Sequence, residues 1–279
     1  MFGIINKKEL AKDVTQFTLD APQIAKKARA GQFVSVVIDE AGERIPLTLA
    51  DWDADKGTIT IIFQKVGFTT KRLGALNEGD FLQHIVGPLG HPTEVIRSGT
   101  VVCIGGGVGI AEVYPVSRAF KEAGNRVLGI IGARCGALLI LEDKMREVCD
   151  ELFITTDDGS SGRKGFVTDS LSELLTVVER STHTRYPDLV YCIGPVPMMQ
   201  AVSRMTKEYN IKTIVSLNPI MVDATGMCGS CRCTVSGKTV FGCVDGPDFD
   251  GHAVDFEELK KRLGLFRDQE RKADGKCGS

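Results

Sequence analysis

The sequence predicts a protein of class α/β plus β, in which an antiparallel β-barrel precedes a doubly wound parallel sheet and a small C-terminal domain. Three observations lead to this prediction. Short β-branched runs separated by glycine and proline fill residues 1–97. Strand and helix patterns alternate over residues 98–220, and four of the nine cysteines crowd into residues 228–243, within the last region 221–279. We therefore expect three domains with these boundaries.

Length and charge limit the classes of function. The 279 residues suffice for two or three packed domains. A formal net charge of −2 offers no basic surface, so we expect neither a nucleic-acid partner nor a membrane partner. Every apolar run falls short of the ~20 residues that a membrane span needs. The first ten residues already contain Lys7, Lys8 and Glu9, which interrupt any signal-peptide core, so we expect a cytoplasmic protein.

The barrel is predicted from three strand-like runs, at residues 14–19, 32–38 and 58–63. Turn signals that contain glycine separate these runs. Short strands and turns at this spacing are typical of a small antiparallel barrel. The second region begins with a buried-strand pattern at 100–104, followed by a glycine loop and a helix that ends near 123. Further strands are expected at 126–131, 152–155, 189–193 and 213–217, and helices at 138–148, 167–178 and 196–208.

The glycine loop consists of Gly105, Gly106, Gly107 and Gly109 and lies where a strand passes into a helix. Backbone N–H groups at such a junction can bind a phosphate, which favours a nucleotide site. A tight structural turn is the alternative, because the loop departs from the strict dinucleotide fingerprint. The second strand is followed by Arg134 where that fingerprint has an acidic residue.

The third region contains Cys228, Cys231, Cys233 and Cys243, and ends in a polar helix expected over about 255–271. A Cys-x-x-Cys pair on a glycine-rich loop, joined by a third thiolate from a hairpin, can enclose a metal centre. An iron–sulfur cluster, a zinc site with all four cysteines, a redox pair and structural thiols all remain open. Cys231 and Cys233 would face opposite sides of a strand, so we do not expect them to bind the same ion.

Six motifs together resemble the ferredoxin reductase superfamily over essentially the whole chain. The closest resemblance is to the electron-transfer subunit of dihydroorotate dehydrogenase and to the small subunit of NADH-dependent ferredoxin:NADP oxidoreductase, also described as sulfide dehydrogenase. The motifs are Arg44-Ile-Pro46-Leu47-Thr48, Gly67-Phe-Thr69-Thr70, Gly105 to Gly109, Thr156-Asp157-Asp158-Gly159-Ser160, Gly194-Pro195 and the cysteine loop.

The resemblance implies the residues of two sites. FAD would be bound by Arg44, Pro46, Leu47, Thr48, Gly67, Thr69 and Thr70, with Thr48 near the reactive flavin N5 and no other catalytic residue. NAD(H) would be bound, in preference to NADP(H), by Gly105, Gly106, Gly107, Gly109, Asp157, Asp158, Gly159, Gly194 and Pro195. The superfamily usually has Cys-Gly-Pro at the last turn. Here Ile193 separates Cys192 from Gly194, so this thiol is not expected to be catalytic.

The resemblance also implies a [2Fe–2S] cluster with Asp223, Cys228, Cys231 and Cys243 as ligands. The dihydroorotate relatives have a fourth cysteine where this chain has Asp223, whereas the ferredoxin:NADP oxidoreductase small subunit has an Asp-plus-three-Cys cluster. This difference favours the second family. The alternative role for Asp223 is a carboxylate that caps its own loop.

The implied protein is an oxidoreductase subunit that exchanges hydride between NAD(H) and FAD and passes single electrons through the cluster to a larger partner subunit. In the favoured family that partner carries its own flavin and iron–sulfur clusters, binds NADPH and ferredoxin, and takes part in electron bifurcation. The alternatives are the dihydroorotate dehydrogenase subunit and, in a different class, a zinc-stabilised nucleotide-binding regulator. Colour distinguishes the zinc protein from both flavoprotein subunits, because a protein with a flavin and a [2Fe–2S] cluster is brown-yellow and a zinc protein is colourless.

Overall fold

The computed structural model describes residues 1–40, 42–179 and 186–275. The chain divides into two compact units. One comprises Met1–His91, Asn218–Pro247 and Asp255–Ser279, and the other comprises Pro92–Leu217 and Asp248–Val254. The barrel region and most of the cysteine region thus fall in one unit, and the three-domain division stays a prediction.

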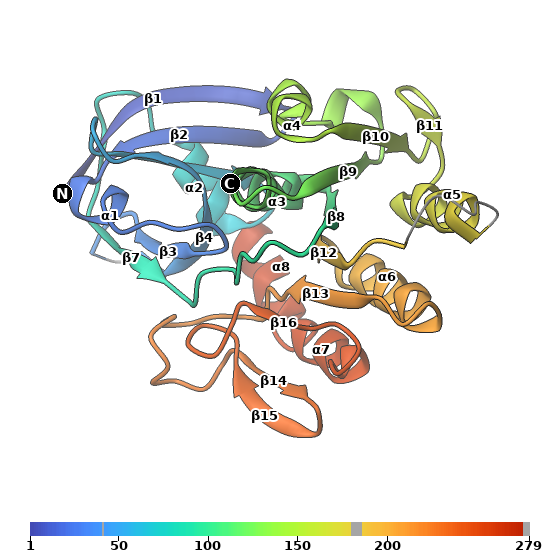
Figure 1. Ribbon diagram of the computed structural model, residues 1–279. Helices are drawn as coiled ribbons and strands as arrows, with labels where there is room; N and C mark the ends of the chain where they lie inside the picture. The colour runs from blue at the N-terminus through green and yellow to red at the C-terminus, as the bar shows by residue number, and fades with distance from the viewer. Residues whose placement is uncertain (41, 180–185, 276–279) are drawn as a thin grey trace. The chain divides into compact units, whose positions relative to one another are not determined.

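The first unit contains the expected antiparallel barrel, which confirms the predicted class (Figure 1). Its sheet has the order β6-β1-β2-β5-β4-β3-β7. Only Gln83 separates β6 from β7 in the chain, so the two edge strands follow one another and the sheet nearly closes. The strands are β1 (Phe2–Ala11), β2 (Val14–Asp20), β3 (Phe33–Val37), β4 (Ile45–Asp53), β5 (Thr58–Gln64), β6 (Phe81–Leu82) and β7 (His84–Leu89), with helices α1 (Pro22–Ala25) and α2 (Phe68–Ala75).

Alternating apolar side chains fill the barrel. Phe17 and Leu19 of β2 and Ile59 and Ile61 of β5 are fully buried, because every second residue of a strand faces the same side. The rings of Phe17 and Phe63 meet edge to face, with centroids 5.2 Å apart. This core makes the barrel a rigid support for the loops at its rim.

The C-terminal part of the first unit is a hairpin of β14 (Arg232–Val235) and β15 (Lys238–Phe241), followed by α7 (Phe256–Leu263) and α8 (Arg267–Gly275). The single helix expected over about 255–271 is therefore wrong. The chain leaves α7 at Gly264, where the N–H groups of Gly264 and Leu265 donate to the carbonyls of Lys261 and Arg262 three residues back. These tightened bonds end the helix, and glycine is the poorest helix former apart from proline.

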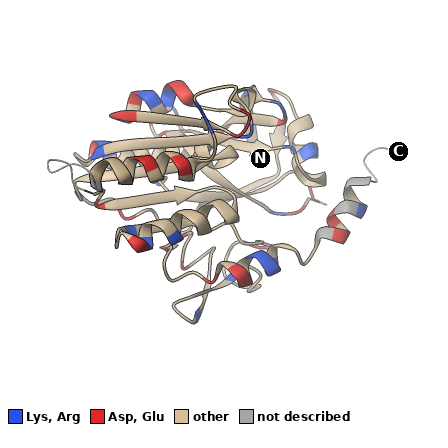
Figure 2. Cartoon of the chain, turned by 90° about the vertical axis from the view of Figure 1, so that its right-hand side faces the viewer, with Lys and Arg blue, Asp and Glu red and all other residues tan. Residues whose placement is uncertain are grey.

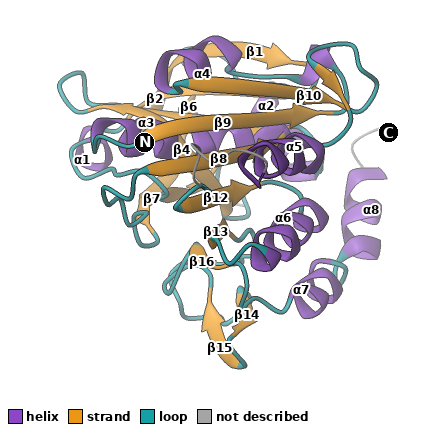
Figure 3. Ribbon diagram, turned by 45° about the vertical axis from the view of Figure 1, so that its right-hand side comes forward, coloured by secondary structure: helices purple, strands orange, loops and turns teal. Residues whose placement is uncertain are grey.

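The second unit is a doubly wound sheet of order β11-β10-β9-β8-β12-β13-β16, parallel except for β16. The helix pair α3 and α4 and the pair α5 and α6 cover its two faces (Figure 3). Its strands are β8 (Thr100–Gly106), β9 (Arg126–Ala133), β10 (Glu151–Thr156), β11 (Arg163–Lys164), β12 (Leu189–Ile193), β13 (Lys212–Ser216) and β16 (Asp248–Asp250). Its helices are η1 (Gly107–Gly109), α3 (Ile110–Glu122), η2 (Gly136–Leu138), α4 (Glu142–Val148), α5 (Val167–Glu179) and α6 (Val196–Glu208).

The start of α4 and the edge strands β11 and β16 of this unit differ from expectation. The helix expected at 138–148 begins only at Glu142, because Leu141 is in the left-handed region at φ 55°. Strand β16 was not foreseen: it comes from the cysteine region and pairs antiparallel with β13, Phe249 opposite Val215. A segment expected in the third domain therefore completes the second unit's sheet.

Figure 2 shows charged residues of both signs spread over the described part of the chain, as the small net charge suggests. None of the helices in the described ranges combines the length and the hydropathy that crossing a bilayer requires.

Candidate functional site

The first group of predicted site residues lies on β4. Ile45 and Leu47 pack against the barrel core, so the side chains of Pro46 and Thr48 face the other side of the strand. Pro46 and Thr48 are half-buried. Because the side chain of Leu47 packs into the core, only its backbone can contact a ligand.

The start of α2 adjoins this strand's loop. The Thr69 hydroxyl donates to Glu43 Oε2 at 2.7 Å, and Arg72 pairs with Asp39, so the β3–β4 loop is tied to α2 at two points. Gly67 precedes the helix, and a methyl group added to it would meet no atom within 4 Å. The first turn of α2 contains no acidic residue. The open space at Gly67 before this helix fits the pyrophosphate of a dinucleotide, with the Glu43 carboxylate beside Thr69 as its acidic neighbour.

The hydroxyl of Thr70 is engaged locally. It accepts from the N–H groups of Val66 and Gly67 at 3.1 Å and lies 3.1 Å from the Gly67 carbonyl. Thr70 therefore holds the turn that presents Gly67. Arg44 is exposed, and its Nη1 lies 3.5 Å from the backbone carbonyl of Asp223, so it extends from the barrel to the cysteine loop.

The second group lies in the other unit, where the carboxyl ends of β8 and β12 meet. The strands pair in register, with Gly105 opposite Ile193, and the chain order of the sheet reverses between them. A methyl group on Gly109 would lie 2.8 Å from the Ile193 carbonyl, and one on Gly194 would lie 3.1 Å from Gly106 Cα. The structure thus brings Gly105, Gly106, Gly107, Gly109, Gly194 and Pro195 together at the switch point where doubly wound sheets bind nucleotides.

Asp157, Asp158 and Gly159 follow β10 at the same edge of the sheet, with β9 and the exposed Arg134 between them and the glycine turn. The Asp158 carboxylate accepts from the side chain and backbone of Ser160, at 2.6 and 2.9 Å. These bonds lower the pKa of Asp158, the side-chain bond being the larger cause. Asp158 therefore shapes its own turn, and Asp157 is the exposed carboxylate beside it.

Cys192 is completely buried in β12, and burial raises the pKa of its thiol. A buried neutral thiol is a structural group rather than a reactive one. This placement agrees with leaving Cys192 out of the catalytic set.

The cysteine loop holds the third group. Cys231 and Cys243 are buried with their sulfurs 3.2 Å apart, much longer than the ~2.05 Å of a disulfide. The Cys243 N–H points at the Cys231 sulfur at 3.5 Å. Cys228 is exposed on the same loop and accepts from the Ser230 N–H, also at 3.5 Å.

Asp223 caps this loop. Its Oδ2 accepts from the Cys228 N–H at 2.9 Å, while its Oδ1 accepts from the backbone and hydroxyl of Thr225. The backbone bond from Thr225 is the largest cause of a lowered pKa at this carboxyl. The loop-capping role is thus visible in the contacts, and the ligand role stays a prediction.

Cys233 lies apart from these groups. It is buried in β14, and its sulfur lies 3.8 and 4.0 Å from the carbonyls of Cys231 and Val240. Burial raises the pKa of this thiol to about 11.

The loop fits an iron–sulfur cluster in three respects, although no three candidate metal ligands of the described ranges converge on one point. Two thiols already touch without being bonded. Two backbone N–H groups point at sulfur, as they do where thiolates carry negative charge. Gly226 and Gly229 have φ of 89° and 67°, which only glycine adopts without strain and which turns the loop around the sulfurs.

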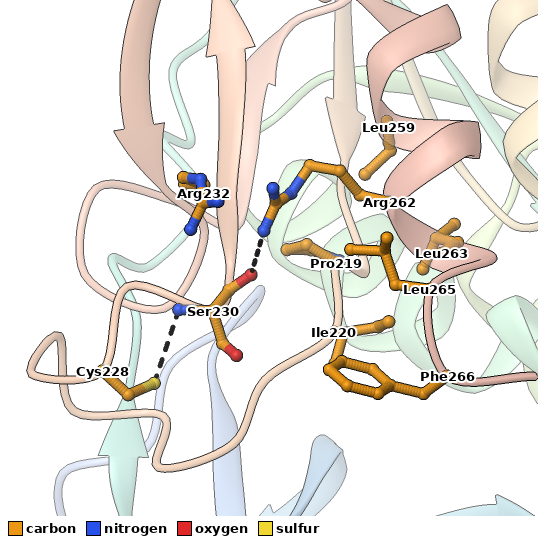
Figure 4. Close-up of a pocket in the computed structure, with 10 residues that line it drawn as sticks. All are labelled: Pro219, Ile220, Cys228, Ser230, Arg232, Leu259, Arg262, Leu263, Leu265 and Phe266. Carbon is orange, nitrogen blue, oxygen red and sulfur yellow. Dashed lines mark hydrogen bonds between the residues drawn. The ribbon is translucent and has the colours of Figure 1, made fainter. Parts of the chain in front are cut away.

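A small cavity of about 210 Å³ lies beside this loop (Figure 4). Its polar wall contains Cys228, Ser230 and two arginines, Arg232 and Arg262. Its apolar wall is formed by Pro219, Ile220, Leu259, Leu263, Leu265 and Phe266.

Sequence reasoning missed one buried polar cluster in the second unit. The Tyr191 hydroxyl lies 3.0 Å from Asp248 Oδ1 and 3.3 Å from Glu112 Oε1, and Thr93 donates to Asp248 Oδ2 at 2.6 Å. No sequence signal could have found it, because it depends on β16 joining the sheet.

Comparison with known proteins agrees with these observations. A family model described as the iron–sulfur cluster binding domain of dihydroorotate dehydrogenase B matches residues 218–255. A Thermotoga maritima protein named as a homolog of the dihydroorotate dehydrogenase B (NAD(+)) electron transfer subunit is 46% identical over 268 residues, 96% of this chain and 92% of its own. The subunit of that name from Bacillus mycoides is 31% identical, covering 88% of this chain and 94% of its own.

Solved structures show the same fold. A structure from work on flavin-based electron bifurcation by NADH-dependent reduced ferredoxin-NADP oxidoreductase has a TM-score of 0.92 and 44% identity, covering 100% of this chain and 98% of that chain. Phthalate dioxygenase reductase, at 18% identity and a TM-score of 0.57 over 91% of this chain and 97% of its own, shares the fold alone.

A nearly closed antiparallel barrel, a doubly wound sheet and an iron–sulfur binding region define an oxidoreductase with a ferredoxin reductase-like fold. Within that class, the chain belongs to the family of dihydroorotate dehydrogenase B electron transfer subunits and their homologues. The resemblance expected from the sequence motifs is confirmed.

Proposed function

We propose that this chain is the small subunit of a bifurcating ferredoxin:NADP oxidoreductase, taking electrons from NADH and delivering them singly to a larger subunit. The observation that carries the proposal is the whole-chain similarity, at a TM-score of 0.92, to a structure described for an NADH-dependent reduced ferredoxin-NADP oxidoreductase. When bound, FAD would accept the two electrons of one hydride and release them singly, and a [2Fe–2S] cluster would carry those electrons onward.

The first unit binds FAD. Arg44 gives a charge-assisted contact to phosphate, Gly67 lets the backbone approach the pyrophosphate, and the open N-terminus of α2 adds N–H donors. Thr48 and Pro46 present the outer face of β4 to the isoalloxazine, with the Thr48 hydroxyl as donor or acceptor near N5. Thr69 and Thr70 keep α2 and the β3–β4 loop in place for this contact, together with the backbone of Leu47.

The second unit binds NADH. Gly105, Gly106, Gly107 and Gly109 let the pyrophosphate approach the start of α3, and Gly194 and Pro195 form the facing turn. Asp157, Asp158 and Gly159 border the same edge of the sheet. Hydride transfer needs no general acid or base, so these residues act by binding and orientation.

The cysteine loop holds the cluster through Asp223, Cys228, Cys231 and Cys243. The protein contributes a hard oxygen donor at Asp223 and N–H groups directed at two of the sulfurs. We propose a cytoplasmic location and a partner that binds NADPH and ferredoxin.

The test is to purify the chain with and without its co-expressed partner and to measure FAD, iron and acid-labile sulfide. We expect about one FAD and two irons and two sulfides per chain, with flavin bleaching on addition of NADH. A colourless protein that binds one zinc would contradict the proposal.

The dihydroorotate dehydrogenase role is a second candidate, favoured by the names of the curated relatives. It predicts that the partner reduces this chain on addition of dihydroorotate. Reduction by NADPH with ferredoxin, and not by dihydroorotate, would support the first proposal.

A further inference from the structure

The turn between Cys228 and Cys231 is held by two arginines for which the sequence motifs predict no role. Arg262 of α7 donates through Nη2 to the Ser230 carbonyl at 3.0 Å. Arg232, the first residue of β14, donates through Nη1 to the Gly229 carbonyl at 3.2 Å. Figure 4 shows Ser230 between Cys228 and Arg262, with its N–H toward the sulfur and its carbonyl toward the guanidinium.

The two contacts act on consecutive peptide groups. The Gly229 carbonyl and the Ser230 N–H belong to one peptide plane, so the guanidinium of Arg232 polarises the same group that donates to the Cys228 sulfur at 3.5 Å. Hydrogen bonds linked in this way strengthen one another. The guanidinium of Arg262 acts likewise on the next peptide plane, which leads into Cys231.

Helix α7 is fixed in position to do this. Its N-cap Asp255 accepts from the Glu258 N–H at 2.9 Å, and the Asp255 N–H donates to the Thr234 carbonyl of β14, also at 2.9 Å. Leu259 is completely buried one turn before Arg262. These contacts anchor α7 to the hairpin. Arg262 is half-buried on this helix.

Each guanidinium donates to a backbone carbonyl rather than to a carboxylate. In the described part of the chain, neither Arg232 nor Arg262 takes part in an ion pair. A cluster gains a negative charge on reduction, so adjacent cations and polarised N–H···S bonds favour its reduced form.

We propose that Arg262 and Arg232 are positioning residues that orient the Cys228–Cys231 turn and raise the reduction potential of the [2Fe–2S] cluster bound there. The proposal rests on the proposed function, because it requires the cluster. It assigns to α7, outside the ligand loop, a part in setting how readily the cluster accepts an electron.

The test is a redox titration of the loaded full-length chain, followed by electron paramagnetic resonance. Arg262→Gln should lower the ratio of reduced to oxidised cluster at a fixed potential by about tenfold, or about 59 mV for a one-electron centre. Arg262→Lys, which keeps the charge, should recover most of the shift, and Arg232→Gln should lower the ratio in the same direction.

The matched control is Lys261→Gln, which removes one positive charge from the exposed residue just before Arg262 in α7. A shift in Arg262→Gln no larger than that in Lys261→Gln, with the cluster intact in both, overturns the proposal. Loss of the cluster in Arg262→Gln alone, with recovery in Arg262→Lys, supports the positioning role. A wild-type chain without iron and sulfide overturns the proposed function itself and this inference with it.

Discussion

At Asp248, burial and hydrogen bonding act on one carboxyl in opposite directions. Burial raises its pKa, while hydrogen bonds from the Thr93 and Tyr191 hydroxyls lower it, and the balance is a pKa of about 6. Asp248 as a residue is only half-buried, but its carboxyl oxygens face Thr93 and Tyr191 within the second unit. The folded state therefore favours the neutral carboxyl more than the unfolded state does.

This raised pKa predicts a pH dependence of stability. The group binds its proton more tightly in the folded state than in the unfolded state, so its contribution to stability is complete below about pH 4 and is lost as the pH rises through 6. Two pKa units correspond to at most about 3 kcal/mol. We expect the free energy of unfolding of Asp248→Asn to rise relative to that of wild type as the pH increases from 4.5 to 7.5. Urea unfolding at a series of pH values measures this difference.

Asp250→Asn, two residues further along the same strand and exposed, is the control and should follow wild type across this range. An Asp248→Asn protein whose stability runs parallel to wild type from pH 4.5 to 7.5 would show that this carboxyl is already ionised in the folded protein.

Asp223 and Cys233 offer a second residue-scale prediction. Asp223→Cys should assemble a [2Fe–2S] centre with an altered electron paramagnetic resonance signal, because thiolate replaces a harder oxygen ligand. Cys233→Ala should keep the native signal, since the backbone carbonyls of Cys231 and Val240 are the hydrogen-bond partners of its sulfur in the described structure. Asp223→Asn keeps one oxygen that can accept from Thr225, but it loses the anion and the second oxygen, which accepts from the Cys228 N–H.

A cluster lost in Cys233→Ala and unchanged in Asp223→Asn would identify Cys233 as the fourth ligand. The main distinction from the dihydroorotate-type relatives would then disappear.

At the scale of elements, the glycine turn between β8 and α3 depends on close packing. Gly109 has an ordinary φ of −60°, so only space restricts it, and an added methyl would lie 2.8 Å from the Ile193 carbonyl and 3.1 Å from Gly194 Cα. We expect Gly109→Ala to cost about 1–3 kcal/mol and to weaken NADH binding, as measured by thermal unfolding and by flavin reduction at limiting NADH.

Gly67→Ala is the matched control. Its φ is −129° and its added methyl meets no atom within 4 Å, so the unfolding temperature of the FAD-free protein should stay close to wild type while FAD retention falls. Equal stability of both variants would mean that the β8–β12 contact tolerates a methyl group.

The sequence predicted the elements whose signal is local. Strand β12 and helix α6 have the expected bounds, because a buried apolar run and a helical repeat each appear within one window. The three residues of β16 are too few for such a signal, and the break after Leu263 depends on a single glycine. The cysteine spacing revealed a metal centre, but the bond from Arg262 to Ser230 joins residues 32 apart and could not be read from any motif.

At the scale of the whole molecule, the choice between NADH and NADPH as electron donor determines which reaction the protein is coupled to. We predict that hydride reaches the flavin at least tenfold faster from NADH than from NADPH in stopped-flow measurements at 450 nm. Arg134 is exposed after β9, where a 2′-phosphate could be bound, and Arg134→Ala should leave the NADH rate unchanged. A tenfold preference for NADPH that Arg134→Ala abolishes would reverse the assignment.

Strand β16 limits how such a protein can be shortened or recombined. The chain leaves the first unit after Pro247, contributes Asp248–Val254 to the second, and returns at Asp255. A gene truncated before Asp248 would lose α7 and α8 and also expose the edge of β13, where an unpaired strand invites aggregation. The C-terminal region that contains the cysteine loop therefore cannot be deleted without affecting the second unit. A shortened protein would need another strand to cover β13.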